Sequence, residues 1–425
     1  MKAAIKRMTF WIKDILHNRS LIYSQYKEVL KINSMADNDF QSAKLYEIKE
    51  FAINNTEFYK DYTVESQFPI MTKIDYIANK ERIQSQKYQG KSDNHLSSTS
   101  GSTGIPFSVL QNYEKRCRTI ADLKAFGVMG GYKSHQKMVC FRAYNGKCLD
   151  RKIDRMDNIW RIDVSNLKDA KMKDMVKEIE KQKPVMILSY VSALETFVNY
   201  IIKNNIDIKH DKLKSIMTVS EGLSDISKDR ISSAFMNIPV YERYSNMEMG
   251  IIAQKDKTDF FKINCASYAV EILKLDVDEK ADSGTVGRIV VTDLFNKAFP
   301  MIRYDTGDLG IMTIINNIPY IEKIYGRRLD VIFNTSGELL NPHAITRVLY
   351  GVSGVLQWQF IQKNKCKYEL RYVCAGLISV DLDNLRIRIK SQVGNDAVIE
   401  FMKIDAIPEG NSYKRKPIIN EWKKN

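Results

Sequence analysis

The amino-acid sequence predicts an α/β protein with a large N-terminal domain and a small α+β C-terminal domain. Three observations lead to this fold class. Apolar runs alternate with amphipathic segments between residues 138 and 241, strand patterns crowd together from Tyr268, and alternation returns after Gly326. We therefore expect mainly parallel sheets and a β-rich subdomain within residues 1–325, followed by the small domain over residues 326–425.

Residues 1–90 are expected to form a helical region. Within the first twenty residues, lysine and arginine surround apolar side chains at helical spacing, namely Met8, Trp11, Ile12, Ile15 and Leu16. Packing of this basic helix on the protein's own body is the favoured interpretation, and contact with an anionic lipid surface is the alternative. Further along, the extended break at residues 68–71 makes Thr72 a candidate helix cap.

The stretch Ser97–Gly104, Ser-Ser-Thr-Ser-Gly-Ser-Thr-Gly, contains only hydroxyl residues and glycines. Backbone amides brought close by glycine, together with hydroxyl groups, can replace the water around phosphate oxygens. The spacing differs from the Gly-x4-Gly-Lys-Ser/Thr loop of nucleotide triphosphatases. A flexible linker is the alternative, but a mostly apolar run follows at residues 105–110, which a tether between domains does not need.

The middle of the chain then alternates between the two kinds of element. Short buried strands are predicted at Met138–Phe141, Val185–Leu188, Ser215–Val219 and Pro239–Tyr241. Helices are predicted at Leu167–Gln182, Ala193–Asn204 and Ser227–Met236. This order favours a largely parallel sheet.

The last third of the chain is richer in strands. The β-rich subdomain is predicted from Tyr268–Leu273, Gly287–Thr292, Leu309–Ile315 and Ile318–Ile321. The small domain is predicted to hold strands at Val355–Ile361, Lys367–Val373 and Ile399–Ile404, with helices at Asn341–Leu349 and Asn384–Val393.

Composition and charge limit the classes of partner. With 44% hydrophobic and 27% charged residues in 425, the chain has the composition of a globular protein. The net charge of +14 is spread along the chain and favours nucleotides, anionic sugars or a lipid surface. No nucleic-acid-binding signature is present, so nucleic acid is not expected as a partner. The six cysteines show no Cys-x2-Cys spacing, and no apolar run approaches the ~20 residues of a membrane span. We therefore expect a cytoplasmic location.

Four ordered motifs follow the hydroxyl-rich stretch. They are Tyr244-Ser245-Asn246-Met247-Glu248, Ile302-Arg303-Tyr304-Asp305-Thr306-Gly307-Asp308, Gly326-Arg327-Arg328-Leu329-Asp330 and, over residues 407–415, Ile-Pro-Glu-Gly-Asn-Ser-Tyr-Lys-Arg. Their order and spacing resemble the adenylate-forming superfamily of acyl-CoA synthetases, adenylation domains and luciferases. Within it, the chain is most similar to the branch of phenylacetate-CoA ligase and the CapK-type proteins of surface-polysaccharide gene clusters, through residues 68–73, 99–106, 189–194 and 298–304.

The resemblance implies a nucleotide site. The loop that would close over the ATP phosphates consists of Thr99, Ser100, Gly101, Ser102, Thr103 and Gly104. Part of the adenine pocket and its aromatic wall are implied for Ser220, Glu221, Gly222, Tyr241, Glu242, Arg243 and Tyr244. Asp308 would accept hydrogen bonds from the ribose hydroxyls, and Arg327 would contact ribose or phosphates. Taken alone, Asp308 also suits an ordinary Gly-Asp turn and Tyr244 a core tyrosine.

The resemblance also implies two catalytic residues and a hinge. Glu248 would help to bind Mg²⁺, for which a carboxylate is a preferred ligand, although a surface glutamate is the plainer interpretation. Lys414 would contact the carboxylate and α-phosphate oxygens during adenylation, with Lys416 as the alternative and a solvated basic tail as the plainer interpretation. Asp330 falls near the hinge about which the mobile small domain rotates between half-reactions.

Some positions depart from the family pattern. Ser245 replaces a usual glycine, and Met247 replaces the hydroxyl residue that usually contacts the α-phosphate. Tyr413 replaces the glycine of the commoner Ser-Gly-Lys sequence. Because a thioether donates no hydrogen bond, one phosphate contact is missing or comes from elsewhere. A protein that keeps the fold and has lost catalysis is therefore the competing hypothesis. Against it stand four charged residues together, Glu248, Asp308, Arg327 and Lys414.

The expected reaction is activation of a small carboxylic acid or amino acid by ATP and Mg²⁺, with release of pyrophosphate and acyl transfer to an amine or thiol. The CapK-type resemblance favours a sugar amine or sugar acid as acceptor in polysaccharide assembly. The phenylacetate-CoA ligase resemblance would instead imply an aryl acid and coenzyme A. Residues 139–145 and 189–194 are the expected acyl pocket, and the sequence indicates no oligomeric state.

Overall fold

The computed structural model divides the chain into two compact units, one holding most of residues 1–324 and the other Gly307–Leu309 together with residues 325–425. The predicted boundary between residues 325 and 326 remains our proposal. The structure describes residues 2–35, 37–98, 107–144, 149–275, 277–327, 332–340, 345, 348–349, 352, 355–374, 380–405, 407 and 418–422.

The N-terminal region is helical. Its elements are α1 (Lys2–Asn18), α2 (Leu21–Met35), α3 (Asn38–Asn55), α4 (Lys73–Ala78), α5 (Lys80–Ile83) and the 3₁₀ turn η1 (Gln86–Tyr88). Thr72 caps α4 as predicted, because its hydroxyl accepts a hydrogen bond from the Asp75 amide while the Asp75 carboxylate accepts one from the Thr72 amide. A hairpin of β1 (His95–Ser98) and β2 (Ser108–Gln111) and the long helix α6 (Tyr113–Met129) complete the region.

An eleven-stranded sheet forms the centre of the larger unit, with neighbours in the order β10-β11-β12-β13-β9-β8-β7-β6-β5-β3-β4. Its parallel part contains β3 (Met138–Arg142), β4 (Ile159–Asp163), β5 (Met186–Tyr190), β6 (Ser215–Val219) and β7 (Val240–Asn246). The strands that follow are β8 (Gly250–Lys255), β9 (Phe261–Ile263), β10 (Tyr268–Leu273), β11 (Val286–Asp293), β12 (Tyr304–Ile315) and β13 (Ile318–Arg327). The predicted α/β class, with parallel strands before denser β-structure, is confirmed.

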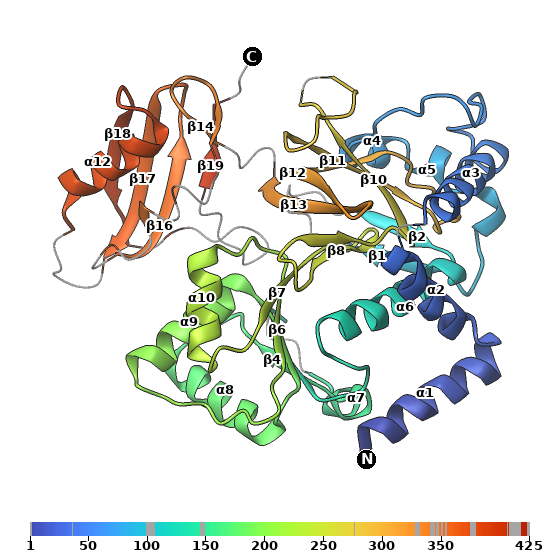
Figure 1. Cartoon of the computed structure of the whole chain (residues 1–425), viewed down its shortest axis with the longest axis horizontal. Helices are drawn as coiled ribbons and strands as arrows, with labels where there is room; N and C mark the ends of the chain where they lie inside the picture. The colour runs from blue at the N-terminus through green and yellow to red at the C-terminus, as the bar shows by residue number, and fades with distance from the viewer. Residues whose placement is uncertain are drawn as a thin grey trace. The chain divides into compact units, whose positions relative to one another are not determined.

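Four helices accompany the parallel strands, namely α7 (Arg151–Asp157), α8 (Asp169–Gln182), α9 (Val191–Lys203) and α10 (Asp225–Ala234). Helices α8, α9 and α10 gather beside β4, β6 and β7 (Figure 1). Their buried side chains, among them Met175, Phe197 and Ile231, share one apolar cluster with Ile187 and Ile216 of the strands. This cluster fixes the carboxyl ends of β3, β5, β6 and β7 along one edge, the usual place for a ligand in such sheets.

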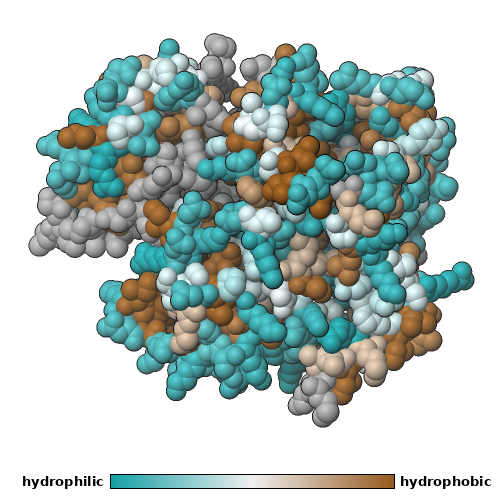
Figure 2. Space-filling model, viewed as in Figure 1, coloured by the Kyte–Doolittle hydropathy of each residue, from teal (hydrophilic) through white to brown (hydrophobic). Residues whose placement is uncertain are grey.

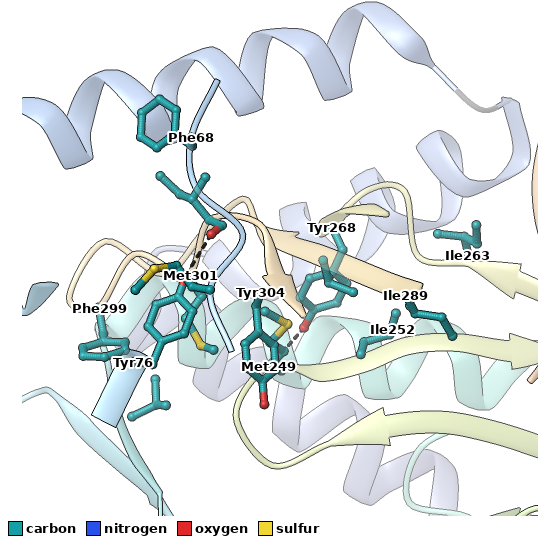
Figure 3. Packing of buried hydrophobic residues seen from close by; sticks show 14 of the residues in the cluster. Phe68, Tyr76, Met249, Ile252, Ile263, Tyr268, Ile289, Phe299, Met301 and Tyr304 are labelled. Atoms are coloured by element: carbon teal, nitrogen blue, oxygen red, sulfur yellow. Dashed lines mark hydrogen bonds between the residues drawn. The ribbon is translucent and has the colours of Figure 1, made fainter. Parts of the chain in front are cut away.

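A second apolar cluster joins segments that are distant in sequence. Phe68 and Tyr76 from the N-terminal region pack with Phe299, Met301 and Tyr304, as Figure 3 shows. The Tyr76 hydroxyl, fully buried, donates a hydrogen bond to the Ile302 carbonyl at 2.9 Å. The helical N-terminal region is therefore part of the core of the larger unit.

The smaller unit contains β14 (Ile332–Phe333), β15 (Leu339–Leu340), β16 (Val355–Gln362), β17 (Lys367–Cys374), α12 (Leu382–Val393), β18 (Val398–Lys403) and β19 (Ile418–Asn420). Four of these strands form a sheet in the order β18-β17-β16-β19. Leu385, Ile389 and Val393 of α12 are buried against it. The predicted α+β character is confirmed, whereas most of the predicted helix Asn341–Leu349 lies outside the described residues.

Helix α1 packs through only one of its faces. Trp11 meets the rings of Tyr23 and Tyr26 at 5.0 and 5.6 Å between centroids, and the neighbouring Phe10 meets His135 at 5.4 Å. The helix therefore packs on the protein, as favoured from the sequence, through Phe10 and Trp11. Four of the five apolar residues that predicted the helix take no part in this packing, because Met8, Ile12, Ile15 and Leu16 are exposed.

The docking of α1 is expected to depend on pH through His135. Burial, assisted by the nearby cations Lys124, Lys6 and Arg7 and opposed by Asp157, lowers the pKa of His135 from 6.5 to about 4. Between these two pKa values the unfolded chain binds more protons than the folded one. The contribution of His135 to the free energy of unfolding is therefore fully present above pH 6.5 and is lost as the pH falls toward 4.

This expectation is checked by melting the wild type and His135→Asn across that pH window. Asparagine tolerates the left-handed backbone at this position, where φ is 64°. The wild type should lose more of its melting temperature on acidification than the variant does. Parallel curves for the two proteins would contradict the assignment.

Candidate functional site

The turn between β7 and β8 carries Glu248 and is held from several sides. Inside the turn, the Asn246 carboxamide oxygen accepts a hydrogen bond from the Met249 amide at 2.9 Å. From the β1–β2 hairpin, the Ser97 hydroxyl donates to the Met247 carbonyl at 2.6 Å, and Gln111 donates to the Glu248 carbonyl at 3.2 Å. The strand that contains Ser97, where the hydroxyl-rich stretch begins, and the strand that follows the stretch are thus bound to the backbone around Glu248.

Buried side chains support the same turn from below. The Tyr268 hydroxyl donates to the Met249 carbonyl (Figure 3) and itself accepts a hydrogen bond from the Lys115 ammonium at 3.0 Å. Lys115 pairs in turn with Asp293, with 2.7 Å between Nζ and Oδ2, and both side chains are fully buried. Gly250 completes the turn with φ 120°, where an added Cβ would lie 3.0 Å from the Tyr268 oxygen.

Glu248 and Met247 differ sharply in exposure. The glutamate is 7% exposed, whereas the methionine is 50% exposed. No group of three His, Cys, Asp or Glu side chains that suits a metal ion occurs among the described residues. Mg²⁺ is commonly bound by one or two carboxylates together with substrate phosphates and water. The backbone of Glu248 is held beside the β1–β2 hairpin, so its single carboxylate remains a candidate rather than part of a complete metal site.

The segment Ser220–Gly222 follows β6 at the carboxyl edge of the parallel strands. Ser220 has a left-handed backbone, with φ 70°. The Glu221 carboxylate accepts hydrogen bonds from the Ser192 amide at 2.7 Å and the Ser192 hydroxyl at 3.0 Å, in the first turn of α9. The Glu221 carboxylate is therefore bound by α9, whereas Ser220 is exposed at this edge.

Two charged side chains of β7 are also occupied within the sheet. Glu242 is buried, with its carboxylate 2.6 Å from the Lys255 ammonium and accepting from the Leu223 amide at 3.2 Å. Arg243 donates to the Gln254 side chain at 2.9 Å, and burial lowers its pKa to about 10. Both side chains therefore hold β7 and the following segments in place.

Two tyrosines lie on the same strand. Tyr244 donates a hydrogen bond from its hydroxyl to the Thr306 hydroxyl at 3.2 Å, which joins β7 to the Asp-Thr-Gly-Asp segment of β12. Tyr241 is half-buried beside the cluster of Tyr132, Met186 and Met217. Tyr244 thus has the hydrogen-bonded hydroxyl expected for a core tyrosine as well as a position at the predicted site.

The remaining predicted residues are placed less completely. Asp308 is half-buried in β12 after Gly307, whose φ is 77°. Arg327 ends β13, and its side chain lies outside what the structure describes. The other predicted positions outside the described residues are Thr99, Ser100, Gly101, Ser102, Thr103, Gly104, Asp330, Lys414 and Lys416.

The contacts that Ser97 and Gln111 make with the turn were missed from the sequence. Ser97 and Gln111 contact a turn more than a hundred residues away, and no local pattern marks such a contact. At the expected acyl pocket, Arg142 ends β3 and donates to the Tyr190 hydroxyl at the end of β5 at 3.4 Å. Both residues lie within the ranges expected for the acyl pocket. The carboxyl ends of parallel strands, which meet at one edge of a sheet, are a second signal that points to this pair.

Comparison with known proteins agrees with this architecture. No family model matches the chain. Protein CapK of Staphylococcus aureus is 26% identical, over 94% of this chain and 92% of that protein. The structure of 2-hydroxyisobutyryl-CoA ligase superposes with a TM-score of 0.71 at 17% identity, covering 91% of this chain and 89% of the ligase. Amide bond synthetase McbA from Marinactinospora thermotolerans gives 0.56 at 13% identity, covering 76% and 67%. The predicted resemblance to the adenylate-forming ligases, and to their CapK branch, is confirmed.

Proposed function

We propose that this AMP-forming ligase activates a small carboxylic acid or amino acid as an acyl-adenylate and then transfers the acyl group to an amine or thiol. The observation that carries the proposal is the position of Glu248. This residue is buried in a turn whose backbone accepts hydrogen bonds from Ser97 and Gln111, in the two strands of the hairpin that carries the hydroxyl-rich stretch. The similar ligases support it, since 2-hydroxyisobutyryl-CoA ligase was solved in complex with 2-HIB-AMP.

In the proposed first step, a carboxylate oxygen of the acid attacks the α-phosphorus of ATP. The bond from that phosphorus to the bridging oxygen of pyrophosphate breaks, and the acyl-adenylate forms. We propose that Ser100, Ser102, Thr103 and Gly104 bind the β- and γ-phosphates, and that Lys414 contacts the oxygens on which negative charge develops. Mg²⁺ bound at Glu248 would neutralise phosphate charge.

The nucleoside is proposed to lie along the carboxyl edge of the sheet. Asp308 would accept hydrogen bonds from the ribose, with Arg327 beside ribose or phosphates. The backbone of Ser220–Gly222 and the ring of Tyr241 would bound the adenine. The acid would lie toward Arg142 and Tyr190, where the guanidinium suits a substrate that carries a second anionic group.

In the proposed second step, the acyl group leaves AMP for the acceptor. The CapK-type resemblance of the sequence, which similarity to Protein CapK over most of both chains supports, favours an amide in surface-polysaccharide assembly. The acyl group would then pass to a sugar amine, or an activated sugar acid would pass its acyl group to the amine of an amino acid. Similarity to 2-hydroxyisobutyryl-CoA ligase favours the second candidate, coenzyme A. We propose that the small domain rotates about a hinge near Asp330 between the two steps.

We also propose a cytoplasmic location with peripheral association at the membrane. Among the helices in the described ranges, none has the length and hydrophobicity needed to cross a membrane. Association would then take place through a surface of the folded protein.

Exchange of labelled pyrophosphate into ATP tests the proposed activity. Pools of aliphatic, dicarboxylic, aryl and amino acids are offered to the wild type and to Lys414→Ala. We expect exchange with one pool, and a loss of at least about a hundredfold in the variant, because a cation at the developing charge contributes several kcal/mol. Silence with every pool, while ATP still binds by calorimetry, would support the non-catalytic alternative.

A further inference from the structure

The outer face of α1 exposes five large apolar side chains. Their exposed fractions run from 46% for Ile12 to 72% for Leu16, and the full set is Ile5, Met8, Ile12, Ile15 and Leu16. Their spacing of three and four residues places them on one side of the helix. Hydrophobic side chains gather accordingly at the lower right of Figure 2, where α1 lies in Figure 1.

This face carries no negative charge. The single acidic residue of α1, Asp14, is 1% exposed, and its carboxylate accepts hydrogen bonds from the Ile22 and Tyr23 amides at 3.2 and 2.9 Å. Lys13 and, just beyond the helix, Arg19 are exposed. The outer face of α1 is therefore apolar and cationic.

The helix is held in this orientation by its other face. Besides the packing of Phe10 and Trp11, the Lys6 ammonium donates to the Met156 carbonyl of α7 at 3.4 Å. Helix α7 exposes two more large apolar side chains, Ile153 and Met156. The exposed apolar residues of α1 are thus presented by a helix fixed in place and beside further apolar surface.

Two occupants suit an exposed apolar face, a second copy of the chain and a lipid surface. A symmetric dimer through this face would bring Lys13 and Arg19 of both copies toward one another with no acid on α1 to offset them. An anionic bilayer instead receives the apolar side chains below its headgroups and pairs the cations with lipid phosphates. Charge therefore favours the bilayer.

We infer that the outer face of α1 binds an anionic membrane surface, with the helix lying parallel to the bilayer. This names the surface for the peripheral association proposed above, and it requires no step of the ligase reaction. The partner is defined by its chemistry as a bilayer with anionic headgroups.

Sedimentation with vesicles tests the inference. The full chain is mixed with vesicles of phosphatidylcholine alone or with about one third phosphatidylglycerol, at low and high salt. We expect binding only to the anionic vesicles, weakened by salt. Ile12→Gln/Leu16→Gln should lower the affinity by at least about tenfold, since two apolar side chains no longer enter the bilayer.

The matched control is Ile314→Gln/Ile387→Gln, which changes two exposed isoleucines elsewhere and should bind as the wild type does. Both variants should melt as the wild type, because the altered side chains are exposed. Equal binding by Ile12→Gln/Leu16→Gln, or no binding by the wild type, would overturn the inference. So would a dimer, seen by analytical ultracentrifugation, that only this α1 variant loses. Pyrophosphate exchange tests the activity separately.

Discussion

Replacing Lys115 with methionine is expected to lower the free energy of unfolding by roughly 3–5 kcal/mol. The Lys115 ammonium lies 2.7 Å from the Asp293 carboxylate, and neither side chain reaches solvent. Removing the cation leaves an uncompensated charge in the interior and also removes the donor to Tyr268. Urea unfolding of the full chain measures the effect in the transition of the larger unit.

An exposed ion pair provides the matched control. Lys274 and Glu279 lie 2.6 Å apart, but their side chains are 45% and 68% exposed. Because solvent screens such a pair, Lys274→Met should change the free energy of unfolding far less than Lys115→Met does. The double variant Lys115→Met/Asp293→Asn should recover part of the loss by removing the orphaned charge. Similar losses in the Lys115 and Lys274 variants would contradict the role of burial.

Buried charged residues such as this pair could not be predicted from the sequence. Buried strands with apolar runs, such as Ser215–Val219, were predicted with their observed bounds. Helix α6 was not predicted, because Lys115, Arg118 and Asp122 interrupt its apolar pattern although all three are buried. Their partners lie elsewhere in the chain, as when Arg118 donates to the Ser267 hydroxyl at 2.8 Å. Local periodicity carries no information on such pairs.

The strand β7 was predicted too short because its second half is mostly polar. The strand expected at Pro239–Tyr241 continues to Asn246, through four polar residues and Tyr244. Both charged residues are accommodated in the strand by partners on β8: Glu242 forms an ion pair with Lys255, and Arg243 donates a hydrogen bond to Gln254. Strand β4 was missed for a related reason, since Arg161 and Asp163 alternate with its apolar residues. The motif around Glu248 was found from its resemblance, whereas its supports required the fold.

Replacing Glu248 with glutamine is expected to reduce pyrophosphate exchange by at least about a hundredfold at fixed Mg²⁺. Glutamine keeps the size of the side chain but loses the charge that a hard cation prefers. A loss of about 3 kcal/mol in stabilisation of the transition state corresponds to that factor. The turn itself should persist, because Ser97 and Gln111 bind the backbone carbonyls of residues 247 and 248, which the substitution leaves in place.

The dependence on Mg²⁺ separates a metal ligand from a structural residue. If Glu248 binds the metal, the glutamine variant should need a higher Mg²⁺ concentration for half-maximal exchange and should melt as the wild type does. Glu279→Gln, which changes an exposed glutamate of the same unit, should alter neither quantity. Exchange within about threefold of the wild type, with an unchanged Mg²⁺ requirement, would exclude Glu248 as the metal ligand. Because Met247 supplies no phosphate contact, the proposed reaction depends all the more on this carboxylate.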